Sequence, residues 1–326
     1  MTKRIVVGNR KPLVEDILFI EGITRSGKFL LANVLSGFHG VEPVQNCRLL
    51  EMLPVFARFH LVDKKLAAEI LRCDIDIHCY EMLIGRNLNH RVSDKSAIFK
   101  HPRYREFLKR CSMPDGDSAL ARFYEEKPCS LFVMHETMPN IDVYFDLFRK
   151  LKIIHMKRGP MELVFSLYKR GGGRRLNSDP RYWMIPFEER KKLFPWYVYP
   201  HQKKYFEHSE MDKVALRVIN LFTMYKKKFA TLPKAYTKRI LMVSYENLLL
   251  EPKKMVNAIA SFLGKKPSLQ MPAILRREHL PNHAHLSKES EKISEIKKLV
   301  SSEHFNILLK LQKEYEQYLS VELGGL

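Results

Sequence analysis

The sequence predicts an α/β fold, with a central parallel sheet flanked by helices, a P-loop-like first connection and helical insertions. Four short apolar runs lack the polar alternation of a half-exposed strand, as strands covered on both faces do. Helical patterns follow or separate these runs, and strands that alternate with helices form parallel sheets. A glycine-containing loop joins the first run to the first helical pattern. Together these observations favour a P-loop NTPase-like architecture.

Each predicted strand is short and buried, and the strands occupy residues 16–20, 130–134, 152–156 and 239–244. The predicted helices occupy residues 28–38, 141–150, 160–170 and 252–263. Pro160 stands at a first-turn position, where a missing N–H costs nothing. Gly264 follows the fourth helix as a C-cap.

Longer stretches lie between these units. Residues 41–127 and 174–238 predict helical insertions, and residues 288–319 predict one C-terminal helix. The aromatic residues of segment 182–205 are expected to pack an inserted helical subdomain, with a role in gripping an acceptor as the alternative. No Pro/Gly/Ser-rich linker separates two halves, so residues 1–326 are expected to form a single domain.

The composition indicates the partners and the cellular environment of the protein, but it does not identify a reaction. The 56 Lys and Arg residues exceed the 36 Asp and Glu residues, which gives a formal charge of +20 and favours anionic partners. The five cysteines form no CxxC pair, so reduced thiols are expected rather than disulfides or a zinc site. No apolar run approaches the roughly 18 residues of a membrane span. These features predict a cytoplasmic protein without a transmembrane segment.

The loop after the first strand has the features of a phosphate cradle. Residues 17–31 read ILFIEGITRSGKFLL, so Gly22, Gly27 and Lys28 fit the spacing GxxxxGK. The glycines let the backbone turn tightly and point N–H groups inward, while the following helix adds the positive end of its dipole. Arg25 and Lys28 add full positive charges. A nucleoside triphosphatase needs Ser or Thr after the lysine to hold magnesium, and Phe29 stands there instead. The loop therefore predicts phosphate binding without a dedicated metal.

A second anion site is expected at the end of the third strand. Arg158 lies there, just before Pro160 starts a helix, and Ser166 follows eight residues after Arg158. An arginine at a strand end can fork onto a phosphate, and a serine hydroxyl on the adjacent helix can bond the same group.

At this point the sequence resembles the sulfotransferases that use 3′-phosphoadenosine 5′-phosphosulfate (PAPS). Their first motif is a strand, a (K/R)SG(T/S)(T/S) loop and a helix, and residues 25–27 (Arg-Ser-Gly) match it. Their second motif has an Arg, often a Pro, and a Ser eight residues after the Arg, as Arg158 and Ser166 have. A strand followed by Tyr245-Glu246 and a helix ending in FLG is a third similarity. The three motifs are in the family's order and span residues 16–264. One departure is that Lys28 and Phe29 replace the usual two hydroxyl residues.

The resemblance implies PAPS as the co-substrate and no required metal. By this resemblance, the nucleotide-binding residues are Gly22, Thr24, Arg25, Ser26, Gly27, Lys28, Phe29, Arg158 and Ser166. Charge builds on the oxygen that leaves with the 5′-phosphate, so a cation beside it is needed. Arg25 is the first candidate for that cation and Lys28 the second.

The acceptor must lose a proton, so a general base is also expected. The resemblance places a His or Glu base about twenty residues before Arg158, and His135 and Glu136 follow the second strand there. His135 has a suitable unperturbed pKa near 6.5. Glu136 would need burial to raise its own pKa. The choice between them is open at this stage.

Two other functions compete with this prediction. A P-loop small-molecule kinase is the alternative that the GxxxxGK spacing supports. A nucleic-acid-binding protein is the alternative that the charge of +20 supports, although no RNA or DNA motif accompanies it, and no specific nucleic acid is expected. The acceptor is open among glycan, lipid, small metabolite and protein, an anionic one included. The oligomeric state is open as well, with a homodimer among the options.

Overall fold

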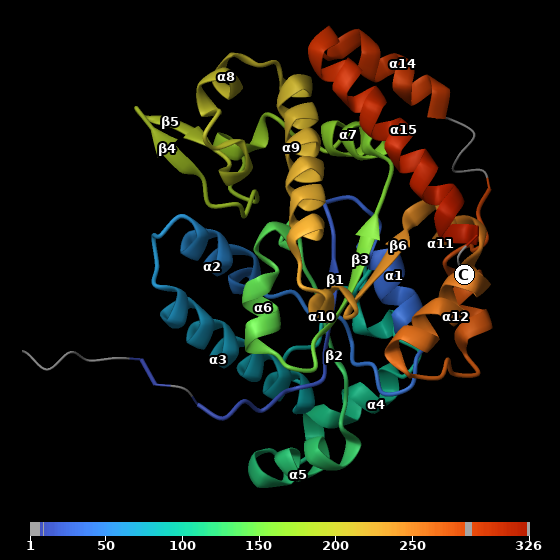
Figure 1. Ribbon diagram of the computed structural model, residues 1–326. Coiled ribbons are helices and arrows are strands. Elements are labelled where there is room, and N and C mark those ends of the chain that lie inside the picture. The colour runs from blue at the N-terminus through green and yellow to red at the C-terminus, as the bar shows by residue number, and fades with distance from the viewer. Residues whose placement is uncertain (1–6, 9, 284–288, 325–326) are drawn as a thin grey trace, which may run out of the picture.

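The computed structural model describes residues 7–8, 10–283 and 289–324. Its centre is a parallel sheet of four strands in the order β2-β1-β3-β6 (Figure 1). The strands are β1 (Ile17–Glu21), β2 (Ser130–Val133), β3 (Lys152–Lys157) and β6 (Ile240–Ser244). The four predicted strands are confirmed, each to within one residue at either end. Parallel registers such as Ile17 with Ser130 and Phe19 with Ile153 align their carboxyl ends at one edge.

Both faces of this sheet are buried, which explains why its strands lack polar alternation. Ile17 and Phe19 of β1 belong to one apolar cluster, whereas Leu18 and Ile20 belong to another on the opposite face. All four side chains are fully buried. Because successive side chains of a strand point to opposite faces, each face needs its own helical cover.

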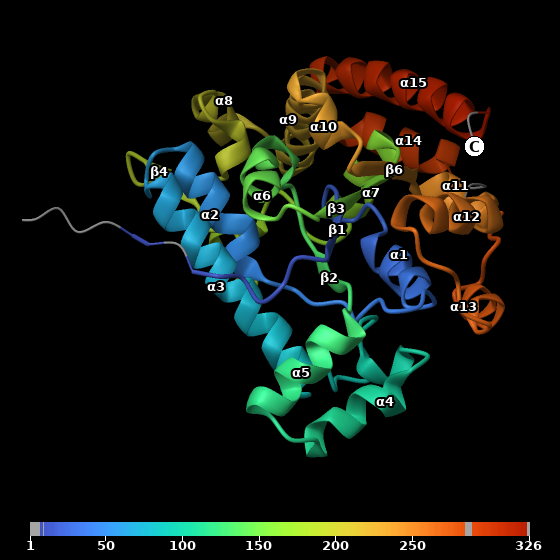
Figure 2. The ribbon, with the colours of Figure 1, turned by 60° about the horizontal axis from the view of Figure 1, so that its bottom comes forward.

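Helices supply that cover on each side (Figures 1 and 2). One face packs against α1 (Lys28–Leu35), α11 (Tyr245–Leu250), α12 (Pro252–Leu263) and α13 (Met271–Arg277). The other packs against α2 (Arg48–Arg58), α3 (Lys64–Leu83), α6 (Asp142–Leu147), α7 (Pro160–Tyr168), α9 (Glu210–Thr231), α14 (Glu289–Leu299) and α15 (Ser302–Gly324). The four predicted helices are confirmed as α1, α6, α7 and α12, three of them shorter than expected.

The remaining helices are short and peripheral. They are α4 (Tyr104–Lys109), α5 (Gly116–Glu126), α8 (Gln202–Glu207) and α10 (Lys234–Thr237). Single 3₁₀ turns occupy η1 (Ile98–Lys100), η2 (Arg110–Ser112), η3 (Met138–Asn140), η4 (Arg175–Asn177) and η5 (Trp196–Val198). Helices α4 and α5 extend from one end of the molecule (Figure 2). In segment 41–127, strand-like pairing is limited to isolated bridges such as Gln45 with Phe132.

The helical insertion expected over residues 174–238 is not helical throughout. This segment also contains an antiparallel hairpin of β4 (Phe187–Glu189) and β5 (Lys192–Phe194). Its two turn residues, Arg190 and Lys191, both have positive φ angles, 49° and 65°. Hairpin turns of this kind are usually marked by Asn-Gly or Asp-Gly. An Arg-Lys pair carries no such signal, so the sequence did not indicate the hairpin.

The expectation of one C-terminal helix over 288–319 is also wrong. The described part consists of two helices, because α14 ends at Leu299 and α15 begins at Ser302. The Ser301 backbone N–H donates to the Asp212 carboxylate of α9 over 2.9 Å, and the backbone N–H of His304 points to the Ser301 hydroxyl. A serine that caps a new helix, held by a carboxylate from another helix, stops α14 at this point. Residue 288 itself lies outside the described residues.

Within the described ranges, every helix is too short or too polar to cross a membrane.

Candidate active site

The predicted phosphate loop connects β1 to α1, and close packing restricts its two glycines. A Cβ atom on Gly22 would lie 2.5 Å from the Met156 carbonyl oxygen. A Cβ atom on Gly27 would lie 2.3 Å from a ring carbon of Tyr245, and the φ of Gly27 is +98°. Both distances are well inside van der Waals contact. Glycine is therefore required at both positions, as the spacing predicted.

The loop presents unsatisfied donors at the start of α1. Gly27 caps this helix, and no side chain bonds its first backbone N–H groups. The hydroxyl of Ser26 is buried and has no hydrogen-bond partner among the described residues. A bare helix N-terminus beside an unpaired hydroxyl fits the oxygens of a phosphate group.

Arg25, Arg158 and Ser166 come together as the sequence predicted. The Arg25 Nε atom donates to the Ser166 hydroxyl over 2.9 Å, and Arg158 Nη1 donates to the Arg25 carbonyl oxygen over 2.8 Å. Burial and then the nearby charges of Arg170 and Arg158 lower the pKa of Arg25. Glu162 pairs with Arg158 Nη2 over 2.9 Å, and the positive charge that remains in excess around Arg25 favours an anion.

The third motif, Tyr245-Glu246, packs against the cluster that contains Arg158. The guanidinium of Arg158 lies 4.3 Å from the centre of the Tyr245 ring, which also fills the space beside Gly27. Glu246 accepts from the Gly159 backbone N–H over 3.1 Å and from the Tyr315 hydroxyl. Tyr245 thus ties the phosphate loop to Arg158, and Glu246 fixes the start of α7.

The Lys28 side chain is buried and bonds the backbone of the loop itself, and it does not lie at the open side of the loop. Its ammonium donates to the carbonyl oxygens of Gly22 and Ile23 over 2.7 and 2.8 Å. Burial lowers the pKa of Lys28 to about 8, although the charges of Glu21, Glu136 and Glu51 oppose the shift. The cation therefore lies between the loop and the predicted base residues.

Phe29 and Thr24 contribute differently from the other loop residues. The Phe29 side chain packs against the apolar cluster around α1. Only the backbone of Phe29 is therefore left for a phosphate. Thr24 accepts a bond from Arg217 Nη2 at its hydroxyl over 3.1 Å, and its backbone N–H points to Glu136 at 3.4 Å.

The two candidate bases have different surroundings. His135 Nδ1 lies 2.6 Å from Glu51 Oε1, which belongs to α2. Burial and then the charge of Lys28 lower the pKa of His135, with Glu51 opposing them. Glu136 is instead buried in an ion pair with Arg217 of α9, whose Nε donates to it over 3.0 Å. Sequence reasoning missed Glu51 and Arg217, since neither lies in a motif.

A cavity of about 250 Å³ opens where the loop and the base meet. Thr24 and His135 both line it, together with the aromatic side chains of Tyr182, Trp183 and Trp196. Its charged lining consists of the arginines Arg48, Arg175, Arg181 and Arg217 and the glutamates Glu51 and Glu136. In the aromatic segment, Tyr197 is buried in the core, whereas Trp183 is two-thirds exposed and lines the cavity.

A second cavity, of about 340 Å³, lies between β3, β6, α9 and α15. Its lining is mainly apolar and includes Ser26 and Arg158, whereas neither His135 nor Glu51 belongs to it. We therefore place the candidate active site at the cavity that contains His135.

Comparisons with known proteins agree with the motifs. The family model of the sulfotransferase domain matches residues 16–323. Among solved structures, the sulfotransferase domain of the Synechococcus PCC 7002 olefin synthase is 14% identical, with coverage of 96% of this chain and 98% of that one and a TM-score of 0.47. The sulfotransferase STF9 from Mycobacterium avium is 12% identical, with coverage of 95% and 77% and a TM-score of 0.44. A search of curated protein sequences finds no relative.

Proposed function

This chain belongs to the sulfotransferase domain family, and from that premise we propose that it transfers a sulfuryl group from PAPS to a hydroxyl or amine of an acceptor. One observation carries the proposal. Thr24 of the phosphate loop and His135, which is paired with Glu51, line the same cavity. A donor phosphosulfate on the loop and an acceptor in the cavity would then meet beside a base.

The donor nucleotide would occupy two anion positions. The loop from Gly22 to Phe29 would hold the 5′-phosphosulfate through backbone N–H groups and the unpaired Ser26 hydroxyl. Arg158 and Ser166 would hold the 3′-phosphate by charge-assisted hydrogen bonds. Arg25 belongs to the loop and reaches Ser166, so its guanidinium spans the two positions.

Departure of the 5′-phosphate oxygen requires positive charge. Sulfuryl transfer breaks the bond from sulfur to that oxygen while the acceptor atom bonds to sulfur, and the charge left on the oxygen is greatest as the bond breaks. Arg25 is the first candidate to stabilise it, because its side chain is held at the loop surface by Ser166. Lys28 is the second candidate, acting from beneath the loop.

His135 is the proposed general base. With its Nδ1–H donated to Glu51, the neutral imidazole presents Nε2 as the proton acceptor. Its lowered pKa keeps the imidazole neutral at pH 7, which is the form that accepts a proton. Glu136 is committed to Arg217 and Thr24, so we assign it to holding the loop in place.

The cavity suggests the class of acceptor. Its lining holds four arginines against two glutamates, beside tyrosine and tryptophan rings. We propose an acceptor that carries negative charge and an apolar or aromatic surface, such as an anionic glycan, lipid or small metabolite. We also propose that residues 1–326 form one domain that acts in the cytoplasm and binds no specific nucleic acid. A homodimer is a separate proposal to test.

Calorimetric titration with nucleotides tests the donor assignment. We expect 3′-phosphoadenosine 5′-phosphate to bind about ten- to a hundred-fold more tightly than ADP, because a bidentate charge-assisted contact contributes roughly 1.5–3 kcal/mol. The preference should be the same with and without Mg²⁺. Equal affinity for the two nucleotides would remove the basis for a PAPS donor. Tighter, magnesium-dependent binding of ATP would instead support the small-molecule kinase.

A further inference from the structure

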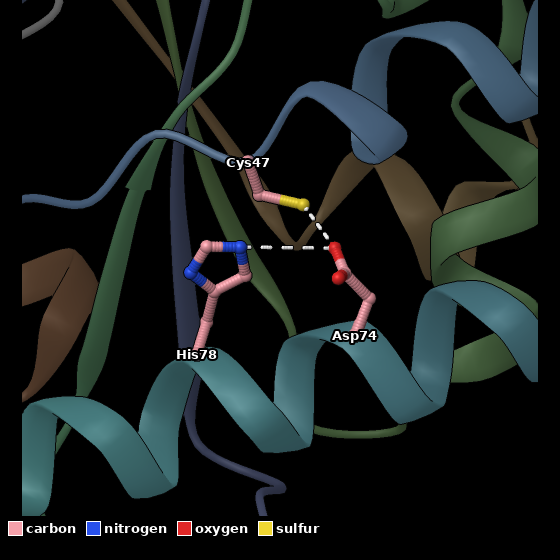
Figure 3. A group of neighbouring side chains, drawn as sticks. All are labelled: Cys47, Asp74 and His78. Carbon is pink, nitrogen blue, oxygen red and sulfur yellow. Dashed lines mark hydrogen bonds and ion pairs between the residues drawn. The ribbon is translucent and has the colours of Figure 1, made fainter. Parts of the chain in front are cut away.

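Three metal-ligating side chains converge about one helical turn from the catalytic candidate Glu51. Cys47, Asp74 and His78 point toward one another (Figure 3). The Cys47 Sγ lies 2.7 Å from Asp74 Oδ2, and His78 Nε2 lies 3.8 Å from that same oxygen. One ligand atom from each residue lies within 4.8 Å of the others, the one such group of three or more found among the described residues.

The local backbone creates this convergence. Asp74 and His78 are four residues apart on α3, so they share one helical face. Cys47 occupies the N-cap position of α2 in an extended conformation, and its side chain does not cap that helix. Its thiol is therefore turned toward α3. The Cys47 residue is almost fully buried, whereas the Asp74 and His78 side chains are about one quarter exposed, which leaves an entry path.

The amide side chains of Asn87 and Gln45 lie behind His78 and orient its ring. The amide nitrogen of Asn87 lies 2.8 Å from His78 Nδ1 and 2.9 Å from Gln45 Oε1. Gln45 is buried, and its amide nitrogen has no partner among the described residues. Turning both amides by half a rotation lets Gln45 donate to the Asn87 oxygen, which then also accepts from His78 Nδ1–H. This arrangement leaves the His78 Nε2 lone pair facing Asp74 and Cys47, as in histidine–metal sites.

We propose that Cys47, Asp74 and His78 bind a Zn²⁺ ion, with water as the fourth ligand. Thiolate, imidazole and carboxylate form a donor set suited to Zn²⁺, whereas Mg²⁺ and Ca²⁺ prefer oxygen ligands. Binding releases the Cys47 proton, and the charges of one thiolate and one carboxylate then balance the cation. Tetrahedral zinc bond lengths require the Sγ-to-Oδ2 separation to open to about 3.6 Å. That is a movement of about 1 Å at flexible side chains.

The bound ion would hold the start of α2 against α3. Cys47 immediately precedes this helix, and Glu51 lies one turn further along it. Gln45 pairs with Phe132 of β2, so the same segment also runs beside the strand that leads to His135. A bond from Cys47 to α3 therefore fixes the helix that carries Glu51. The existence of this site does not depend on the proposed transfer reaction.

Titration with Co²⁺, which replaces Zn²⁺ and is coloured, tests the site in the full chain. A background with Cys73→Ser and Cys111→Ser removes the two exposed thiols. We expect one Co²⁺ per chain with thiolate-to-cobalt charge-transfer absorption, displaced by one equivalent of Zn²⁺. The Cys47→Ser variant should lose this absorption. Cys79→Ser is the matched control, because Cys79 is buried on α3 and bonds Ser130 instead, and it should keep the absorption.

A second variant keeps the test independent of how well Cys47→Ser folds. Asn87→Ala should weaken Zn²⁺ binding 10- to 100-fold in competition with a chromophoric chelator, as loss of a second-shell partner does. Zn²⁺ should also raise the melting temperature of the background protein but not that of His78→Gln. Absence of charge-transfer absorption in the folded background protein would overturn the proposal. So would its persistence in Cys47→Ser.

Discussion

His135 Nδ1 lies 2.6 Å from Glu51 Oε1, although 84 positions separate the two residues in the chain. In the proposed reaction His135 Nδ1–H donates to Glu51, and Nε2 is then left for the acceptor proton. The bond to Glu51 also distinguishes His135 from Glu136, whose carboxylate is occupied by Arg217. The structure therefore favours one of the two bases that the sequence left open.

The first prediction concerns the pH dependence of the base. Burial and Lys28 lower the pKa of His135, so the rate at saturating substrates should rise with pH below about 6.5 and be level by pH 7. His135→Ala should reduce kcat about 10²- to 10⁴-fold and leave nucleotide affinity unchanged. Steady-state rates between pH 5 and 9 would show both effects.

Glu51→Gln extends the same test. Glu51 raises the pKa of His135, so its removal should lower both the plateau rate and the pH of the rising limb. Arg48→Ala is the control, because Arg48 bonds the other oxygen of Glu51 and does not touch His135. Normal turnover in Glu51→Gln would contradict the assigned pair.

The second prediction is that Glu136 contributes to stability rather than to proton transfer. Glu136→Gln leaves the buried Arg217 without its charge partner, which should lower the free energy of unfolding by about 3–5 kcal/mol. The double variant Glu136→Gln/Arg217→Met should recover part of this loss. Urea denaturation would measure it. A stable, correctly folded Glu136→Gln variant without activity would instead identify Glu136 as the base.

The third prediction assigns the 3′-phosphate to Arg158. Arg158→Ala should abolish most of the preference for 3′-phosphoadenosine 5′-phosphate over ADP, and Ser166→Ala a smaller part. Lys169→Ala is the control for charge alone, because Lys169 follows Ser166 on the same side of α7 but pairs with Glu295 at the surface. Calorimetry with both nucleotides separates these variants. If Lys169→Ala lowers the preference as much as Arg158→Ala does, the effect is one of net charge and the assignment fails.

The fourth prediction separates Arg25 from Lys28. Arg25→Ala should lower turnover on the order of a hundred-fold or more, with a much smaller loss of product-nucleotide affinity. Lys28 titrates at about pH 8 in the free protein, and above that pH its cation is lost. The value of kcat/KM for PAPS should therefore fall above about pH 8. The value of kcat should fall only at higher pH, because the bound donor anion stabilises the charged form of Lys28.

Lys157 provides the control for the fall of kcat/KM above about pH 8. Burial also lowers the pKa of Lys157 to about 8, but its ammonium lies over the Tyr318 ring at 3.3 Å. Lys157→Met should therefore retain the decline in kcat/KM, and Lys28→Met should lose it together with most activity. Near-normal turnover in Arg25→Ala, with none in Lys28→Met, would reverse the two roles.

Local pattern was sufficient for the framework of this molecule. Buried apolar runs determined β1, β2, β3 and β6, because a strand covered on both faces carries mostly apolar residues, and its buried polar residues, such as Glu21 and His155, are paired. The spacing of Gly22, Gly27 and Lys28 determined the loop, since the turn and its close contacts admit only glycine at two positions. The eight-residue interval from Arg158 to Ser166 predicted one anion site formed by both residues, and this stays a prediction. The structure then showed Arg25 in contact with Ser166.

The tertiary structure decided which side chains become partners. Glu51 reaches His135 and Arg217 reaches Glu136 because α2 and α9 pack beside the carboxyl end of the sheet, and Cys47 meets Asp74 and His78 because α3 packs against α2. The number and spacing of the cysteines predicted no zinc site, but spacing along the chain cannot show that packing brings Cys47 beside Asp74 and His78. The periodicity of apolar residues shows which side of a helix or strand is buried, and it depends on residues only a few positions apart. Pairing across 27 to 141 positions depends on which helix faces which strand, and that is fixed only when the whole core packs.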